Sequence, residues 1–309
     1  MSISYFLTKI ARALVTMLLV VTFVFVVLRV TGDPSQTILP EDSTEEEREE
    51  FRRSWGLDKP LPEQYARYWL NFLQGNLGRS YRDRRDVKDI IVERLPKTVS
   101  LMGLAIAFSL VVAIPLGVSA ALHRNTFLDR FSMSLGVFGF SMPNFFLGIL
   151  LILLFSVKLR ILPSSGSEGW KHIILPMLTT ASFYLGTYSR FTRSTMLSVL
   201  NKPYIRAATA KGLSRNRVIY GHALPNAAIP IVTIVGGSIG RIVSGSIVVE
   251  TVFAWPGVGR LLVTSVGSRD LAVVQAVVLM LSVSIVAANL VVDLLYGVLD
   301  PRIRTAKGG

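Results

Sequence analysis

The chain has 309 residues, of which 51% are hydrophobic and 17% are charged, and its mean hydropathy is +0.51. Soluble domains carry about 25% charged residues, so a soluble core of this size could not bury this much apolar surface, whereas a bilayer could. The net charge of +13 would by itself suggest a nucleic-acid-binding protein. The hydropathy outweighs that signal, and the composition also excludes intrinsic disorder. The absence of Cys excludes a disulfide framework, a thiolate metal site and a cysteine nucleophile.

Six segments are apolar enough, or nearly so, to cross a bilayer as helices of about 20 residues. The first covers residues 13–28 and is expected to be retained, because no small-residue cleavage site follows it. The others are expected at about residues 98–122, 131–157, 173–190, 226–249 and 271–295. The fourth and fifth signals are the weakest, because Pro176 lies near the start of one and Arg241 interrupts the other. The sequence therefore predicts an all-α polytopic membrane protein with six transmembrane helices.

The distribution of basic residues predicts the orientation. With the N-terminus inside, the inner segments hold 14 Lys and Arg against only Asp129 and Asp300, whereas residues 31–97 hold 12 basic and 14 acidic residues. Short loops rich in Lys and Arg stay in the cytoplasm, so both termini are expected to be cytoplasmic. The expected organisation is residues 1–30 for the N-terminus and first helix, 31–97 for an extracytoplasmic segment, 98–298 for a five-helix core, and 299–309 for a cytoplasmic tail.

The extracytoplasmic segment is expected to be a small domain. Residues 41–50 are strongly acidic and favour a solvated helix. Residues 64–73 place aromatic side chains at intervals of three and four, which is an amphipathic pattern. These aromatics either pack the domain onto the membrane face or contact a substrate or partner; they are Tyr65, Tyr68, Trp69 and Phe72.

The cytoplasmic loop 190–225, between the fourth and fifth spans, is the most informative segment. Residues 190–217 hold seven basic residues and no acidic one. Pro203 suits the first turn of a helix, Gly212 suits the left-handed position that closes it, and Ser214 can cap a second helix. Leu224 and Pro225 are expected to break that second helix. The alternative is a positively charged loop with an interfacial helix and no further role.

The loop also resembles a known family motif. Arg206, Ala207 and Ala208, followed by Gly212 and then Leu224-Pro225, resemble the EAA loop of ABC importer permeases, with Arg206 where that motif usually has Glu. Further motifs, in matching order and spacing, resemble B-type permeases of the dipeptide/oligopeptide/nickel family, which are binding-protein-dependent inner membrane components. They lie at residues 31–34, 56–62, 75–80, 94–98, 141–143, 162–166, 248–262 and 293–304.

The resemblance implies a type I ABC importer permease fold in the bacterial inner membrane. It implies a second related permease beside this chain, cytosolic ATPase subunits beneath, and an extracytoplasmic binding protein that delivers di- or oligopeptides. It also implies that the loop forms a coupling helix that docks on the ATPase. The residues expected to serve this coupling are Tyr204, Arg206, Ala207, Ala208, Lys211, Gly212, Leu213, Leu224 and Pro225.

No sequence motif indicates an enzyme. The phosphate-binding pattern G-x4-G-K-[ST] is absent, and the three His residues lie far apart, so neither ATP hydrolysis nor a metal site is expected in this chain. No cofactor is expected, because ATP and Mg would be bound by the partner ATPase. Nickel or haem import and an ATP-independent carrier stay open as alternatives, although a carrier would favour inverted repeats, and none is seen.

One clear charge, Arg241, lies deep in an expected span. Burying it in lipid would cost about 2.5–3.5 kcal/mol, so it should face protein or water. It contacts either the translocating peptide or a structural partner such as Glu250. Gly237 and Ser244 lie on the same helix, and small residues favour close packing, which suits the interface with the second permease.

The last outer loop opens with Trp255, Pro256 and Gly257. Two roles are open for them. The tryptophan is either an interfacial aromatic anchor, or the three residues form part of an outer gate that stays closed until the binding protein docks.

Overall fold

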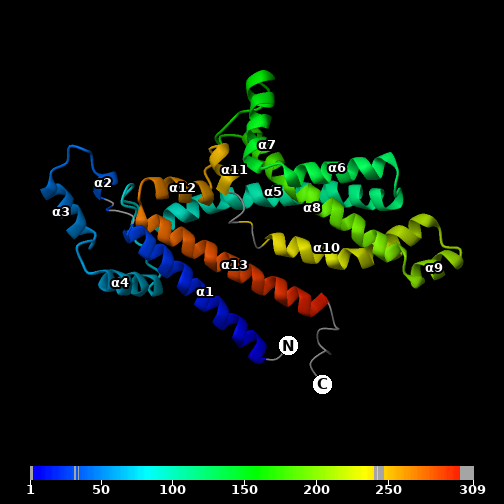
Figure 1. The fold of residues 1–309 in the computed structure, drawn as a ribbon, viewed down its shortest axis with the longest axis horizontal. Coiled ribbons are helices and arrows are strands. Elements are labelled where there is room, and N and C mark those ends of the chain that lie inside the picture. The colour runs from blue at the N-terminus through cyan, green and yellow to red at the C-terminus, as the bar shows by residue number, and fades with distance from the viewer. Residues whose placement is uncertain (1–2, 31–32, 34, 240–241, 243–246, 300–309) are drawn as a thin grey trace. The chain divides into compact units, whose positions relative to one another are not determined.

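The computed structural model describes residues 3–30, 33, 35–239, 242 and 247–299. The described residues form helices and no strand (Figure 1). The chain divides into two compact units. Unit 1 contains Met1–Thr98 and Pro256–Val286, and unit 2 contains Val99–Trp255 and Ala287–Gly309. The predicted all-α polytopic class is confirmed.

Unit 1 has a small core where its helices meet. Val87 and Ile91 of α5 pack with Val258 of α12 and with Val273 and Val277 of α13, all of them buried. The backbone N–H of Val258 donates to the Thr98 hydroxyl at 2.8 Å, which satisfies one free donor at the start of α12. The helices of unit 1 are α1 (Ile3–Val30), α2 (Ser35–Ile38), α3 (Glu45–Ser54), α4 (Leu61–Leu73), the beginning of α5 (Val87–Leu122), α12 (Val258–Gly267) and most of α13 (Leu271–Leu299).

The predicted helices between α1 and α5 are present, and their local sequence explains them. The acidic helix α3 starts with a capping box, in which the Glu47 N–H donates to the Thr44 hydroxyl and the Thr44 N–H donates to the Glu47 carboxylate at 2.8 Å. The aromatic helix α4 packs onto α1: the Tyr65 ring lies 5.2 Å from Phe25, and its hydroxyl lies 2.6 Å from the Thr22 hydroxyl. Two of the four predicted aromatic side chains, Tyr65 and Tyr68, therefore pack against Phe25 of the first helix.

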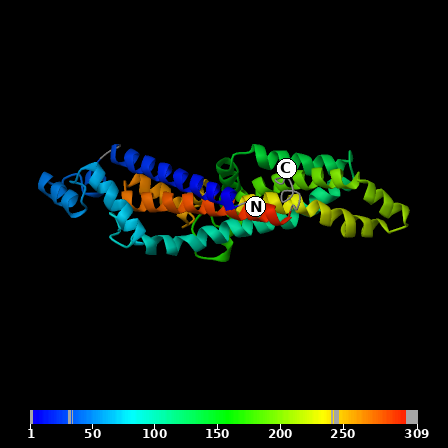
Figure 2. The same cartoon turned by 90° about the horizontal axis from the view of Figure 1, so that it is seen from below.

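Unit 2 is organised around α8. Helix α6 runs along α8 (Figures 1 and 2), and the two backbones come close because Gly136 and Gly186 face each other without side chains. The Ser109 hydroxyl of α5 donates to the Ala181 carbonyl of α8 at 2.9 Å. Besides the rest of α5, unit 2 consists of α6 (Phe127–Ser141), α7 (Asn144–Leu151), a π-helical segment (Ile152–Lys158), a 3-10 turn (Trp170–Ile173), α8 (Ile174–Leu200), α9 (Pro203–Ala210), a second π-helical segment (Arg217–Ala223), α10 (Leu224–Ile239) and α11 (Ile247–Val252).

Each predicted span overlaps at least one helix in the described part of the chain. In the described part of the chain, four helices are long and apolar enough to cross a membrane, or five if the bent pair Phe127–Ser141 and Asn144–Lys158 counts as one. Helix α8, the predicted fourth span, is not among them. It is long enough, with 27 residues, but Arg190, Arg193 and several hydroxyl side chains lower its apolarity. Helix α5 starts at Val87, well before the predicted residue 98.

The third predicted span is not one straight helix. Its two halves, Phe127–Ser141 and Asn144–Lys158, are bent by 104° relative to each other, and the break falls at Met142 and Pro143. Met142 has an extended backbone (φ −84°, ψ 123°), because the ring of the following proline disfavours the helical conformation. Pro143 has no N–H and precedes the first residue of α7. Pro143 thus divides this span into two helices.

The fifth predicted span also differs from its expected form. Leu224 and Pro225 do not break the helix, because the π-helical segment ending at Ala223 continues directly into α10. Pro225 lies in the first turn of α10, and the wider hydrogen bonding of the π-helix accommodates its missing N–H. The predicted range 226–249 covers α10 except for its first two residues, up to its end at Ile239, and the start of α11 at Ile247.

Candidate functional site

Helix α9 and the turn that follows it form the candidate site. Pro203 occupies the first turn of α9, where its missing N–H costs nothing. Gly212 has φ +78°, so the prediction that it closes the helix in the left-handed conformation is confirmed. The Gly212 N–H donates to the Thr209 carbonyl at 3.0 Å, and the Leu213 N–H donates to the Ala208 carbonyl at 3.4 Å. These bonds turn the chain sharply after α9, and we call residues 203–216 the elbow.

The elbow is held by an apolar cluster. Ile205 and Ala208 of α9 are buried together with side chains from the end of α5, the end of α8, the second π-helical segment and α10. Leu213 and Leu224 are half-buried against the same cluster. The buried members on the surrounding elements are Val118, Ala121, Met196, Val199, Val218, Ile219, Ala223 and Ala227. Any movement of α9 is therefore mechanically linked to the ends of four other elements.

The opposite face of the elbow is exposed and basic. Tyr204, Arg206, Ala207 and Lys211 are exposed, and Gly212 has open space around it, since a Cβ there would meet no atom within 4 Å. Because residues 190–217 contain no acidic side chain, this face presents positive charge without internal neutralisation. Such a face suits a partner groove that carries negative charge. Ser214 precedes the second helix, and its carbonyl accepts the Val218 N–H at 3.0 Å.

A buried ion pair anchors the helix that supports the elbow. The Arg193 guanidinium of α8 donates twice to the Asp129 carboxylate of α6, with the Nη2 to Oδ2 distance at 2.8 Å. Asp129 is 3% exposed and also accepts the Asn125 N–H at 2.9 Å. A bidentate pair fixes orientation as well as separation, so it holds α6 and α8 in one alignment. The sequence had placed Asp129 and Arg193 only as loop charges.

The structure places some of the candidate interface residues and leaves others undescribed. Arg241 and Ser244 lie outside the described residues. Glu250 is fully buried in α11. Gly237, in α10, is half-buried, and a Cβ there would meet no atom within 4 Å. Gly237 therefore has no close-packing partner among the residues that the structure describes.

The three candidate gate residues lie in the chain between α11 and α12. Trp255 is 4% exposed and packs with Leu101, Leu175 and Phe253. Because an interfacial anchor must expose its ring to the headgroup region, this burial contradicts the anchor alternative. Pro256 is the first residue of unit 1 after Trp255, and Gly257 directly precedes α12.

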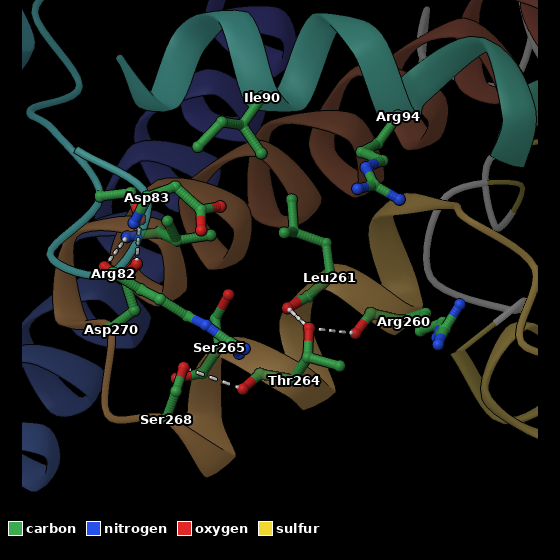
Figure 3. Close-up of a pocket in the computed structure, with 12 residues that line it drawn as sticks. Arg82, Asp83, Ile90, Arg94, Arg260, Leu261, Thr264, Ser265, Ser268 and Asp270 are labelled. Atoms are coloured by element: carbon green, nitrogen blue, oxygen red, sulfur yellow. Dashed lines mark hydrogen bonds between the residues drawn. The ribbon is translucent and has the colours of Figure 1, made fainter. Parts of the chain in front are cut away.

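Sequence reasoning missed a second polar site, at the junction of α12 and α13. Asp270 is 3% exposed, and it accepts the Ser80 hydroxyl and, at 3.2 Å, the Tyr81 N–H. The neighbouring pocket has a volume of about 270 Å³, and Figure 3 shows that Arg82 lies along it. Ser80 belongs to one of the resemblance motifs, but no local pattern connects it to an aspartate 190 residues away.

Comparison with known proteins now identifies the class. A helical membrane protein with an exposed basic elbow on an apolar cluster has the features of a transport permease. Residues 113–305 match the family described as binding-protein-dependent transport system inner membrane component, and residues 2–102 match the corresponding N-terminal family. The chain belongs to this family and is a permease subunit of an ABC importer.

Relatives and a solved structure agree with this assignment. Proteins named glutathione transport system permease protein GsiC, from Pectobacterium atrosepticum, Salmonella paratyphi A and Escherichia coli, are each 41% identical over 303 residues, which is 98% of this chain and 99% of theirs. A structure of the MetNI methionine ABC transporter in inward-facing conformations matches with a TM-score of 0.52 and 19% identity, covering 67% of this chain and 96% of that chain. This second likeness shows the type I permease fold.

Proposed function

We propose that this chain forms, with a second related permease, the translocation path for short peptides that an extracytoplasmic binding protein delivers. The relatives named for glutathione transport support a peptide-like substrate, because they match over nearly the whole chain. The B-type motifs support di- and oligopeptides. Selectivity in such a system resides largely in the binding protein, which is a separate chain.

The elbow is the proposed docking site for the cytosolic ATPase. The observation that carries this proposal is the combination of an exposed basic face and a buried apolar face on one short helix. Tyr204, Arg206, Ala207 and Lys211 would enter a groove of the ATPase, while Ile205 and Ala208 keep the helix attached to the permease. The angle between α9 and the membrane helices is proposed to be set by the turn residues Gly212 and Leu213 and by Leu224 and Pro225 at the start of α10.

The proposed mechanism is alternating access driven from this elbow. ATP and Mg bind in the partner ATPase subunits, whose closure displaces α9 with the groove that holds it. Because Ile205 shares a cluster with Val118 of α5, Met196 of α8 and Ala227 of α10, the displacement moves three helix ends together. Packed clusters shift between discrete arrangements rather than deforming continuously, so the motion opens the path outward. Hydrolysis resets it.

The remaining candidate residues have proposed places in this path. Gly237 is proposed to lie at the interface with the second permease, which its open surroundings support. Arg241, Ser244 and Glu250 are proposed for the path or the same interface. Trp255, with Pro256 and Gly257, is proposed as the outer gate, and its packing in an apolar cluster would keep such a gate closed at rest.

The experiment is a reconstitution of the complete transporter. The tagged chain is expected to co-purify with a second permease and an ATPase, and proteoliposomes are expected to take up a labelled dipeptide only with binding protein and ATP. Competition with unlabelled glutathione, a nickel chelate and haem then ranks the substrate classes. Uptake by the chain alone without ATP would replace the proposal with a carrier, and preference for the nickel chelate or haem would replace the peptide substrate.

A further inference from the structure

Unit 1 contains a cavity that the transport mechanism does not use. It lies between the end of α1, helix α4, the loop that precedes α5 and the first turns of α13, and its volume is about 550 Å³. Small-molecule sites in proteins have volumes of about 300–1,000 Å³. Among its lining residues are Arg29, Gln64, Tyr68 and Gln275.

These four side chains share an unusual property. Arg29 Nε, Gln64 Oε1, the Tyr68 hydroxyl and Gln275 Nε2 are all buried and have no hydrogen-bond partner among the described residues. Gln275 is only 5% exposed and Gln64 only 9%. A buried polar group without a partner is costly, and native proteins rarely leave several in one place. Four such atoms around one cavity indicate that something polar occupies it.

The two glutamines differ in how much freedom they have. The Gln64 amide already donates to the Leu57 carbonyl at 3.1 Å and the Lys59 carbonyl at 2.7 Å, which fixes its oxygen as the free group. Gln275 has no such constraint: its Nε2 is buried without a partner among the described residues, and the amide is free to turn so that this N–H₂ donates to a ligand. The cavity therefore offers an acceptor from α4 and donors from α1 and α13.

The charge and the apolar lining define the ligand. Asp58 is the one acidic residue among those that line the described cavity, whereas its basic residues include Arg29 and Lys59. The other basic side chains there form ion pairs with acids outside the lining: Arg53 with Glu49, Arg67 with Glu63 and Arg79 with Asp86. A guanidinium next to an amide N–H₂ favours a carboxylate. Trp55, Tyr68, Phe72 and Tyr81 supply aromatic walls.

We propose that this cavity binds a small organic acid that carries one carboxylate, an amide or similar hydrogen-bond donor, and an apolar body. The carboxylate would accept from Arg29 Nε and Gln275 Nε2, and the donor would reach Gln64 Oε1. Such a ligand joins α1, α4 and α13, and it stabilises unit 1 by an amount that rises with the logarithm of its concentration above the Kd. The site is formed by residues of unit 1 alone, whereas the elbow belongs to unit 2.

Hippurate is a suitable probe, because it combines a benzoyl group, an amide N–H and a carboxylate, and hippuramide is its neutral counterpart. Binding is measured by isothermal titration calorimetry on the full chain in lipid nanodiscs, without ATPase or binding protein. Hippurate is expected to bind saturably, and hippuramide is expected to bind at least tenfold more weakly, since charge-assisted hydrogen bonds are about twice as strong as neutral ones.

Two variants of one residue test the geometry. Gln275→Leu should weaken hippurate binding about tenfold or more, and it should raise the melting temperature of the ligand-free protein, because it removes a buried amide that lacks a partner. Gln275→Glu should abolish hippurate binding by charge repulsion while retaining hippuramide binding. Gln74→Leu is the matched control, since Gln74 is exposed just beyond α4 and lies outside the cavity lining.

The results separate a ligand site from a water-filled cavity. Hippurate binding that falls in Gln275→Leu and persists in Gln74→Leu supports the proposal. If hippurate does not bind saturably, or binds the Gln275 variants as well as the wild type, the cavity holds only water and the proposal is overturned. Because the assay contains no transport partner, neither result bears on the peptide path.

Discussion

Replacing Gly212 tests the coupling role of the elbow most sharply. Its φ of +78° lies in the left-handed region, which residues with a Cβ rarely adopt. A Cβ at this position would meet no atom within 4 Å, so a substitution causes no clash. The effect of Gly212→Ala, Gly212→Asn or Gly212→Val is therefore conformational and confined to the turn after α9.

The magnitude follows from the backbone. A left-handed conformation costs an ordinary L-residue about 1–2 kcal/mol relative to its right-handed form, and Asn tolerates it better than Ala or a β-branched residue. A change of one or two kcal/mol alters a two-state ratio by a factor of about 5–30. The fraction of molecules with a correctly formed elbow should therefore fall in the order Gly, Asn, Ala, Val for the residue at position 212. Insertion should persist, because Ile205 and Ala208 remain packed in their cluster.

The assay compares coupling with assembly in the same preparation. Peptide-stimulated ATPase activity and ATP-dependent uptake are measured in proteoliposomes, while the amount of chain in the membrane is measured by immunoblot. We expect uptake to fall through the series, about fivefold for Ala and further for Val, at constant membrane content. Gly221→Ala is the matched control: this exposed glycine is helical and lacks a positive φ, so the same change should leave uptake intact.

Two results would refute the reasoning. Wild-type uptake and ATPase stimulation in Gly212→Val would show that the elbow conformation is irrelevant to coupling. An equal loss in Gly221→Ala would show that any added methyl group in this loop disturbs transport, so that the left-handed turn has no special part.

Three further predictions concern the rest of the chain. Arg193→Ala should destabilise the protein by about 3–5 kcal/mol, because it leaves the buried Asp129 carboxylate without its cation, and thermal unfolding in nanodiscs measures this. Burial raises the pKa of Tyr68 to about 12. Since the unfolded pKa is about 10, its contribution to stability is complete below pH 10 and is lost as pH rises toward 12, which a phenolate absorbance titration against Tyr68→Phe detects. Because the chain has no native Cys, Glu46→Cys should react with an impermeant maleimide in intact spheroplasts, and Ala210→Cys only after permeabilisation.

Each of these has a defined contrary outcome. An unchanged melting temperature in Arg193→Ala would show that the ion pair contributes nothing to stability, and combining it with Asp129→Asn should recover part of the loss. Phenolate formation at an ordinary pH for the residue at position 68 would contradict its burial. Equal labelling of both cysteine variants in intact spheroplasts would contradict the proposed topology.

Local chemistry made the elbow predictable from the sequence. Pro203 and Gly212 have backbone preferences that depend on no distant residue, and the structure has both where those preferences place them. The aromatic spacing of α4 was visible for the same reason. Pro225 was misjudged because a proline next to a π-helical segment behaves differently from a proline inside a regular helix.

Contacts between distant segments were not predictable. The pairs Arg193 with Asp129 and Ser80 with Asp270 are separated by 64 and 190 residues, and single-sequence patterns carry no information on such pairs. Gln275 has no sequence signal at all, because its significance lies in the cavity around it. The size of the bend at Pro143 was not predictable either, because it depends on how α6 and α7 each pack against α8.

The most direct test of the central claim is peptide uptake by the reconstituted transporter with and without its ATPase. If the chain is the permease of an ATP-driven peptide importer, a labelled dipeptide accumulates against its gradient only when the binding protein, both permeases, the ATPase and ATP are all present. If uptake is the same without the ATPase, or if the complete system with ATP moves no peptide, the account is wrong.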